Sequence, residues 1–334
     1  MATRPGGRSV RATVEVHSPS HTRPRRTAER TSRPLSTGPV LVVGYDGGAA
    51  SADALVLGAR LARATDGSVI LIAAAPGAGR FARSDWRGRA LRLIGRAVEK
   101  MDPDRPMEAL AVPPGSLLDT SLDVARSEAG SIVVLGEPAD GDAGHARRRL
   151  DAALHAAPRP VALAPAGYRE AAPGALARVG VAFDGWGEAR VALAHAVALV
   201  RVSGAELCLL MVGDPHTAAS REPEADEEAS LAGHMHAARH CVDGVVADLP
   251  RGLRARGIAL NGPVATALTE AARSERLDLL VLGSRRLGPT LRVVLGGVSS
   301  ALAKQPPCPL LIVPRGLDPP RESAAAGRAG ESAW

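Results

Sequence analysis

Short apolar runs alternate with longer stretches of helical periodicity along most of this chain. Residues 40–45 (VLVVGY), 131–136 (SIVVLG) and 278–283 (DLLVLG) are typical runs, and each is rich in Val, Ile or Leu. Apolar runs of this length are typical of strands buried on both faces of a parallel sheet, joined by crossover helices. The pattern therefore predicts an α/β fold built on a doubly wound parallel sheet.

The pattern occurs twice. Residues 40–76 (VLVVGYDGGAASADALVLGARLARATDGSVILIAAAP) align with residues 179–215 (VGVAFDGWGEARVALAHAVALVRVSGAELCLLMVGDP). In both stretches an apolar run ends at an Asp-Gly pair, a segment rich in small residues follows, and a second apolar run comes next. The two pairs are Asp46 with Gly47 and Asp184 with Gly185.

The later parts of the two stretches also match. Gly115 precedes Gly136 by 21 residues, and Gly262 precedes Gly283 by the same distance. Each copy then closes with a short apolar run between prolines, PVALAP in one and PLLIVP in the other. The chain is therefore predicted to contain a duplicated unit.

A chain of 334 residues is long enough for two domains, each with its own core. We assign the domains to residues 39–167 and 177–315, and we expect residues 1–38 and 316–334 to be disordered tails. Eight arginines against two glutamates within residues 1–39 account for the formal net charge of +6. The charge therefore belongs to the tail, where a basic arm that contacts acidic partners is the alternative to a solvated segment.

The composition excludes several classes of function. Aromatic residues make up only 2% of the chain, which disfavours nucleic-acid binding by base stacking. No apolar run approaches the ~20 residues of a membrane helix, and no secretory signal is recognisable. We therefore expect a cytoplasmic protein without membrane or nucleic-acid partners. The three cysteines form no metal-binding pair, and His234, His236 and His240 are expected on a solvated helix face.

Candidate binding residues fall at the expected carboxyl ends of the strands, where open α/β sheets bind ligands. Glycines at such ends allow close approach of a ligand, and a following helix offers unpaired N–H groups to phosphate. The candidates are Asp46, Gly136, Asp184 and Gly283. A carboxylate there can accept a hydrogen bond from a ribose hydroxyl or an adenine amine. The alternative is that each Asp-Gly pair only caps a helix and turns the chain.

These residues and spacings resemble tandem universal stress proteins of the UspA type, over about residues 39–166 and 177–315. The resemblance implies a five-stranded, doubly wound sheet in each domain, with strand order 3-2-1-4-5 and pairing of the domains through their last strands. For the nucleotide-binding branch of the family it implies ATP, with Mg²⁺. The nucleotide would be held by an Asp after the first strand and by a loop of pattern G-x2-G-x9-G-[ST].

The C-terminal copy keeps part of this site. The matching positions, in chain order, are Asp184, Gly185, Gly283, Gly296 and Ser299. Arg286 replaces the second loop glycine, and Gly297 stands at the Ser/Thr position. A cationic side chain favours phosphate by its charge, and a glycine N–H still donates to an anion. A lost hydroxyl removes about 0.5–1.5 kcal/mol, which is too little to forbid binding.

The N-terminal copy matches fewer positions of the nucleotide-binding loop. Asp46 and Gly136 remain, but Arg147 and Arg148 stand where the last glycine and the Ser/Thr belong, and Glu137 places a negative charge beside the phosphate position. We interpret this copy as structural or regulatory. The run of arginines at 147–149 is interpreted as a solvated helix start, with an anion site as the alternative.

The sequence offers no catalytic motif of the nucleophile-elbow or Walker type. The main hypothesis is a stress protein, not an enzyme, that binds or senses an adenine nucleotide through its second domain. The alternative is a scaffold without nucleotide that oligomerises and docks partners through the closing strands. The tandem format favours pairing of the two domains within one chain, and dimerisation of whole chains is left open.

Overall fold

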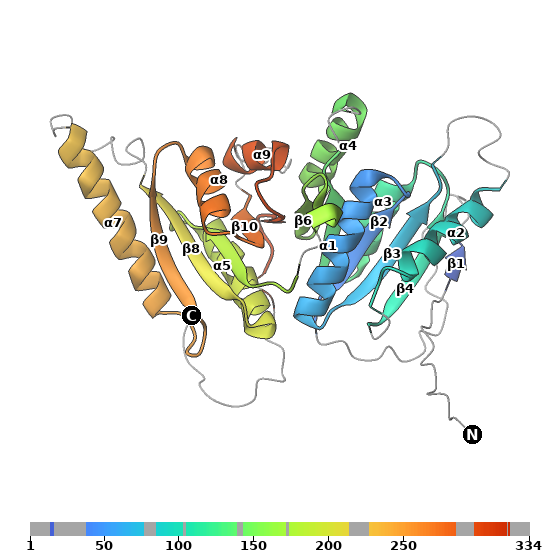
Figure 1. Ribbon diagram of the computed structural model, residues 1–334, viewed down its shortest axis with the longest axis horizontal. Coiled ribbons are helices and arrows are strands. Elements are labelled where there is room, and N and C mark those ends of the chain that lie inside the picture. The colour runs from blue at the N-terminus through green and yellow to red at the C-terminus, as the bar shows by residue number, and fades with distance from the viewer. Residues whose placement is uncertain are drawn as a thin grey trace, which may run out of the picture.

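A computed structural model of the protein describes residues 14–16, 38–76, 85–102, 105–138, 143–171, 174–213, 227–284, 297–318 and 320. The described strands form a single sheet in the order β1-β4-β3-β2-β5-β6-β11-β10-β7-β8-β9. Figure 1 shows the N-terminal half, in blue to green, beside the C-terminal half, in yellow to red.

The N-terminal half builds five parallel strands, β2 (Val40–Tyr45), β3 (Ser68–Ala74), β4 (Met107–Val112), β5 (Ser131–Gly136) and β6 (Val161–Ala164). The connecting helices are α1 (Ala49–Thr65), α2 (Trp86–Val98), α3 (Leu117–Ser127) and α4 (Ala143–Ala156). The strands lie in the order β4-β3-β2-β5-β6, which is 3-2-1-4-5 in chain order.

The C-terminal half repeats this arrangement. Its strands are β7 (Arg178–Ala182), β8 (Glu206–Gly213), β9 (Ala255–Asn261), β10 (Leu279–Gly283) and β11 (Leu310–Val313). Its helices are α5 (Gly187–Ser203), α7 (Glu227–Ala247), α8 (Val264–Ser274) and α9 (Gly297–Lys304). The predicted α/β fold with doubly wound sheets is confirmed, because every pairing within each five-stranded set is parallel.

The two halves meet at the closing strands. Strand β6 pairs antiparallel with β11, with Leu163 beside Leu310 and Val161 beside Ile312. Each closing strand therefore has a neighbour on both sides, since β6 also pairs with β5 and β11 with β10. The scaffold hypothesis places partner docking on these strands, but their edges are already occupied within the chain.

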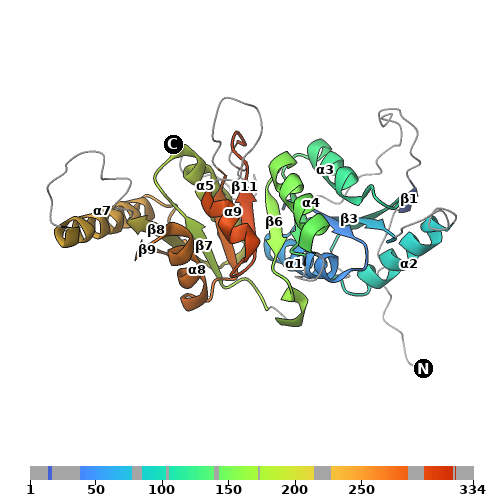
Figure 2. The ribbon, with the colours of Figure 1, turned by 90° about the horizontal axis from the view of Figure 1, so that it is seen from above.

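Apolar side chains fill both faces of the continuous sheet. One core contains buried residues of α1, α2, α5 and α7, and the other contains buried residues of α3, α4, α8 and α9. Figure 2 shows helices on both sides of the sheet. The cores are built from Ala, Val and Leu, and fully buried leucines such as Leu57 and Leu209 occur in both halves. Each core includes residues from both halves, so apolar burial stabilises the junction as well as each half.

The connection between the halves is held by two charged residues of α1 that are almost completely buried. Asp53 accepts hydrogen bonds from the backbone N–H groups of Gly167 (2.9 Å) and Arg169 (2.8 Å). These contacts hold the short 3₁₀ helix Tyr168–Ala171 against α1. Arg60, 6% exposed, donates to the Tyr168 hydroxyl at 2.8 Å and pairs with Asp278 of the other half at 2.5 Å.

The N-terminal tail differs from the prediction at one place. Residues Val14–Val16, within the segment expected to be disordered, form strand β1, which pairs in parallel with β4. An edge strand leaves a row of backbone groups unpaired, and a short segment added to that edge satisfies some of them. The rest of residues 1–37 lies outside the described residues.

The predicted C-terminal tail begins with ordered residues. Gly316, Leu317 and Asp318 are described, and Leu317 packs against the core that contains α1 and α5. Among the described residues, no helix combines the length and apolar character that a membrane-spanning segment needs.

Candidate functional site

The Asp-Gly pairs lie at the carboxyl ends of the first strand of each half. In the C-terminal half Val181 lies beside Val281, and continuing this register by three residues brings Asp184 beside Ser284. In the N-terminal half Val43 lies beside Val134, and the same extension brings Asp46 beside Glu137. The two predicted sites are therefore equivalent in position but differ in charge.

Both aspartates fix the turn that starts the next helix. Asp184, which is exposed, accepts a hydrogen bond from the backbone N–H of Trp186 at 3.0 Å, and Gly185 has a φ of +84°. That positive φ favours glycine. The indole of Trp186, 69% exposed, lies at the start of α5. In the C-terminal half, Asp184 and Gly185 therefore do form the turn between β7 and α5.

The aspartate of the N-terminal half has a further local partner. Asp46 accepts from the Gly48 N–H at 2.8 Å and from the Ser51 hydroxyl at 2.6 Å. Ala189 is the residue equivalent to Ser51 in the C-terminal half, and its side chain has no hydroxyl to donate. The Asp46 carboxylate is therefore held by a side-chain hydroxyl that the equivalent position of the C-terminal half does not have.

The glycines that end the fourth strands serve the fold. A Cβ on Gly136 would lie 1.8 Å from the carbonyl oxygen of Ala50, and one on Gly283 would lie 2.8 Å from that of Glu188. The first turn of α1 or α5 therefore packs directly on the strand end. The sequence pattern leaves open whether these glycines make room for a ligand or for the chain itself, and the close neighbour in each half is the protein's own backbone.

The start of α9 lies close to the end of β10. Ser299 is buried and its hydroxyl donates to the carbonyl oxygen of Gly283 at 3.3 Å. Gly297, the first residue of α9, is exposed. The structure therefore brings Gly283, Gly297 and Ser299 together. The other two loop candidates, Arg286 and Gly296, lie outside the described residues.

An ion pair fills the equivalent region of the N-terminal half. Glu137 accepts from the Ala166 N–H at 3.2 Å and pairs with Arg147 at 3.6 Å. Arg147 also donates to the carbonyl oxygens of Ala303 (2.7 Å) and Lys304 (3.3 Å), at the C-terminal end of α9. A cation is stabilised at that end of a helix.

The prediction of a solvated arginine run is therefore wrong at its first member. The Arg147 side chain is only 21% exposed because it bridges the two halves, whereas Arg148 and Arg149 are exposed. The three arginines also follow the start of α4 by four residues or more. No sequence pattern indicates this contact, because the partner carbonyls are backbone groups of a distant helix.

The C-terminal half has a neutral group where Glu137 lies. Ser284 is buried and accepts from the Arg315 N–H at 3.2 Å, the same contact that Glu137 makes with Ala166. A cavity of about 310 Å³ opens at this end of the sheet, lined by residues 187–188, 191 and 313–317. Arg315 and Glu188, both in its lining, form an ion pair at 3.0 Å.

The histidines and cysteines form no candidate metal or disulfide site within the described residues. His236 and His240 are exposed on α7, and no group of three or more metal-ligating side chains is found in that part of the chain. All three cysteines are free thiols. Burial raises the pKa of the Cys308 thiol to about 12, which disfavours a reactive thiolate.

Residues 176–314 match the model of the Universal stress protein family. The chain is 31% identical over 137 residues to a Thermus aquaticus protein described as a universal stress protein in the QAH/OAS sulfhydrylase 3'region, and it covers 95% of that protein and 40% of its own length. The chain belongs to the universal stress protein family. It is also 28% identical over 149 residues to universal stress protein YxiE of Bacillus subtilis, again with 95% of the relative covered.

The likeness in fold extends over both halves. The crystal structure of a universal stress protein from Archaeoglobus fulgidus superimposes with a TM-score of 0.57 at 17% identity. The match covers 84% of this chain and 99% of that one. Both halves of this universal stress protein family member therefore have the same architecture.

Proposed function

We propose that this stress protein binds an adenine nucleotide in its C-terminal half, at the carboxyl ends of β7 and β10. In this proposal the N-terminal half is a second Usp domain that no longer binds nucleotide and instead completes the sheet. The protein would act in the cytoplasm as a sensor of ATP or a related nucleotide.

One observation carries the proposal: the position that Glu137 occupies in the N-terminal half is occupied by Ser284 in the C-terminal half. At the N-terminal site the Glu137–Arg147 ion pair lies beside Asp46, whereas at the C-terminal site the neutral Ser284 hydroxyl lies beside Asp184. In the N-terminal half a nucleotide would therefore have to enter a position that an ion pair already fills, and it would meet one more carboxylate there. The C-terminal half is therefore the better host for a polyphosphate.

Three residues would contact the nucleotide, and a fourth would position the helix that faces the phosphates. Asp184 is exposed and would accept from the adenosine, while the N–H groups at the start of α9, beginning with Gly297, would face the phosphates. Arg286 would add a positive charge, and Ser299 already positions α9 against Gly283. When bound, Mg²⁺ would neutralise part of the phosphate charge.

Calorimetric titration with ATP and Mg²⁺ tests the proposal. We expect saturable binding to the wild-type chain and at least a tenfold loss in Asp184→Ala, because a ribose or adenine hydrogen bond to a charged group contributes about 1.5–3 kcal/mol. Asp46→Ala is the matched control and is expected to bind like the wild type. No heat of binding at millimolar ATP, or equal losses in both variants, would contradict the proposal.

A second measurement separates binding from turnover. Denaturing freshly purified protein and chromatographing the supernatant would reveal a co-purified adenine nucleotide. Incubation with ATP is expected to release no phosphate above a control without protein, because we propose a sensor and not an enzyme. Phosphate release that Asp184→Ala abolishes would make the protein a slow ATPase instead.

A further inference from the structure

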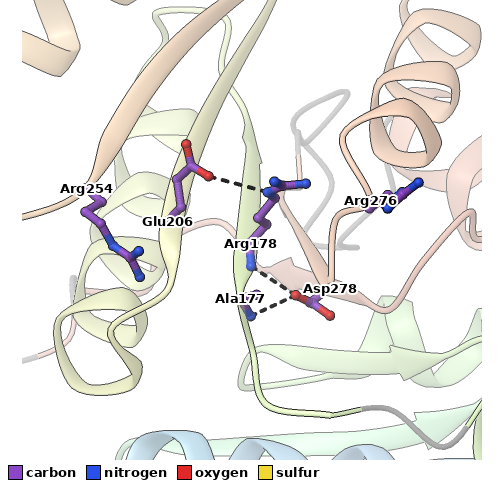
Figure 3. Close-up of a pocket in the computed structure, with 6 residues that line it drawn as sticks. All are labelled: Ala177, Arg178, Glu206, Arg254, Arg276 and Asp278. Atoms are coloured by element: carbon purple, nitrogen blue, oxygen red, sulfur yellow. Dashed lines mark hydrogen bonds and ion pairs between the residues drawn. The ribbon is translucent and has the colours of Figure 1, made fainter.

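The amino ends of β7, β8, β9 and β10 surround a charged cleft (Figure 3). The proposed nucleotide site lies at the other end of these strands, their carboxyl ends. The cleft has a volume of about 440 Å³, and it is lined by Ala177, Arg178, Glu206, Arg254, Arg276 and Asp278. We call this feature the arginine cleft. Two of its lining residues, Ala177 and Arg178, directly follow in the chain the segment that connects the two halves.

The carboxylates in and beside the arginine cleft already have cationic partners. The ion pairs are Arg60 with Asp278, Arg178 and Arg256 with Glu206, and Arg256 with Glu275. Asp278 also accepts from the backbone N–H groups of Ala177 (2.8 Å) and Arg178 (2.9 Å). Three carboxylates are therefore matched by three arginines, which leaves Arg254 and Arg276 as excess positive charge.

Arg254 and Arg276 lie on opposite sides of the cleft, with Arg178 and Glu206 between them (Figure 3). Both are exposed, and the described residues provide neither with an ion-pair partner. Arg254 donates to the carbonyl oxygen of Gly204, which leaves its charge uncompensated. The cleft therefore presents two separated guanidinium groups to solvent.

Arg276 has an unfavourable backbone conformation. Its φ is +50°, in the left-handed region, and it follows the residue that caps the end of α8. Glycine is the usual residue at this position of a helix end, because a side chain costs free energy there. An arginine at this position therefore costs conformational free energy that a glycine would not cost.

The N-terminal half shows what the fold itself requires at this edge. The residues equivalent to Arg178, Glu206, Arg254, Arg276 and Asp278 are Val40, Ser68, Pro106, Ala129 and Ser131, none of which is charged. The same strand order and register form without them. Charged residues at these five positions are therefore not needed to build a domain of this kind. The N-terminal half has a different ion pair, Arg105 with Asp66, near the same end of its sheet.

The order β10-β7-β8-β9 separates the starts of β9 and β10 by three strand spacings, about 14 Å, so a ligand that contacts both arginines must be extended. We propose that the arginine cleft binds an extended polyanion of the linear polyphosphate class. Arg254 and Arg276 would each hold one anionic group, and the Arg178 guanidinium lies between them. The planar guanidinium matches phosphate geometry with two parallel hydrogen bonds. The bound anion would neutralise the excess charge, and it would lie beside the segment that connects the two halves.

Titration with a linear polyphosphate at constant ionic strength tests this inference, and inorganic pyrophosphate, which is too short to reach both arginines, is expected to bind more weakly. We expect saturable binding to the full chain, and at least a tenfold loss of affinity in the double variant Arg254→Gln/Arg276→Gln. Arg251→Gln removes an exposed arginine outside the cleft lining and is expected to bind like the wild type. Absence of binding to the wild type, or equal affinity in the double variant, would overturn the inference.

Two further variants distinguish binding in the arginine cleft from misfolding and from binding at the nucleotide site. Arg276→Gly relieves the backbone strain, so we expect a higher melting temperature together with weaker polyphosphate binding, which misfolding cannot produce. Arg286→Gln removes the cation proposed for the phosphates of the nucleotide, and it is expected to leave polyphosphate binding unchanged, because the arginine cleft is independent of the proposed nucleotide site. Loss of polyphosphate binding in Arg286→Gln, with full binding in the double arginine variant, would place the anion at the nucleotide site and refute the cleft.

Discussion

Arg60 of α1 and Asp278 at the start of β10 are 218 positions apart in the chain, yet they form an ion pair of 2.5 Å between the two halves. Arg60 also donates to the carbonyl oxygens of Gly174 (2.7 Å) and Ala175 (2.8 Å), in the segment that connects the halves. One buried guanidinium therefore joins a helix of the first half, the connection and a strand of the second half.

Replacing Arg60 with methionine is expected to destabilise the protein strongly. The variant leaves Asp278 and two carbonyl oxygens without their cationic donor. Breaking a buried pair costs about 3–5 kcal/mol, and the 23% exposure of Asp278 reduces this to about 2–4 kcal/mol. Urea denaturation followed by tryptophan fluorescence measures the change.

Arg63→Met is the matched control for this experiment. Arg63 lies on the same helix, is 60% exposed and pairs with Asp102 at 3.6 Å. An exposed pair of this kind contributes about 0–1 kcal/mol. Equal effects of the two substitutions would show that the buried pair does not stabilise the junction.

Arg147→Ala is expected to lower stability by about 1–3 kcal/mol. The change removes the donor to the last carbonyl groups of α9 and leaves the largely buried Glu137 without its cation. Arg148→Ala, at the exposed neighbouring position, is expected to change stability by less than about 0.5 kcal/mol. Thermal unfolding of both variants decides whether the bridge between α4 and α9 stabilises the fold.

Gly136→Ala is expected to be among the most damaging single-methyl additions. The new Cβ would lie 1.8 Å from the Ala50 carbonyl oxygen, so α1 must move away from the strand end. Overpacking of this kind costs about 1–3 kcal/mol or more. Gly283→Ala, with its nearest atom at 2.8 Å, is expected to cost less.

Gly95→Ala provides the opposite outcome for comparison. A Cβ on Gly95, within α2, would have no neighbouring atom within 4 Å. Alanine is favoured over glycine inside a helix by roughly 1 kcal/mol, so this variant is expected to be more stable than the wild type. If Gly136→Ala unfolds at the same denaturant concentration as the wild type, close packing at the strand end is not required.

The stability of the fold is expected to fall between pH 6.5 and pH 4 because of His195 on α5. Burial lowers the pKa of this histidine to about 4, and its Nε2 atom has no partner among the described groups. In this window the unfolded chain binds the proton and the folded chain does not, so stability decreases as the pH falls. The contribution is about 1–3 kcal/mol after allowing for partial exposure.

His195→Gln tests this pH dependence, because glutamine has a polar side chain but does not titrate. The difference in unfolding free energy between wild type and variant is measured at pH 7 and at pH 4.5. We expect the wild type to lose stability relative to the variant at the lower pH. A difference that does not change with pH would mean that His195 does not titrate in this range.

Much of the fold was predictable from the chain. The apolar run at residues 40–45 became β2 without change of boundary, and the internal repeat indicated that both halves share one strand order. These features are local or repeated, so a single sequence records them. Strand β1 was missed because three residues within an arginine-rich segment carry too little pattern, and only the free edge of β4 explains their pairing.

The candidate site was predictable only in part. Asp184 and Gly283 lie at the expected strand ends, but the glycine accommodates the backbone of α5, which sequence spacing cannot distinguish from room for a ligand. Arg60 and Arg147 both contact residues more than 100 positions away. Such contacts depend on how the halves pack, and no periodicity in either half indicates them.

The antiparallel pairing of β6 with β11 has a consequence for how the two halves have diverged. It relates them like the subunits of a dimer whose members have been joined by a peptide connection, so each molecule always carries one member of each kind. Each half always has the other as its partner, and it can serve that partner simply by pairing with its closing strand. The two members can therefore differ in sequence wherever the common architecture does not depend on it, because a substitution in one member is not repeated in the other.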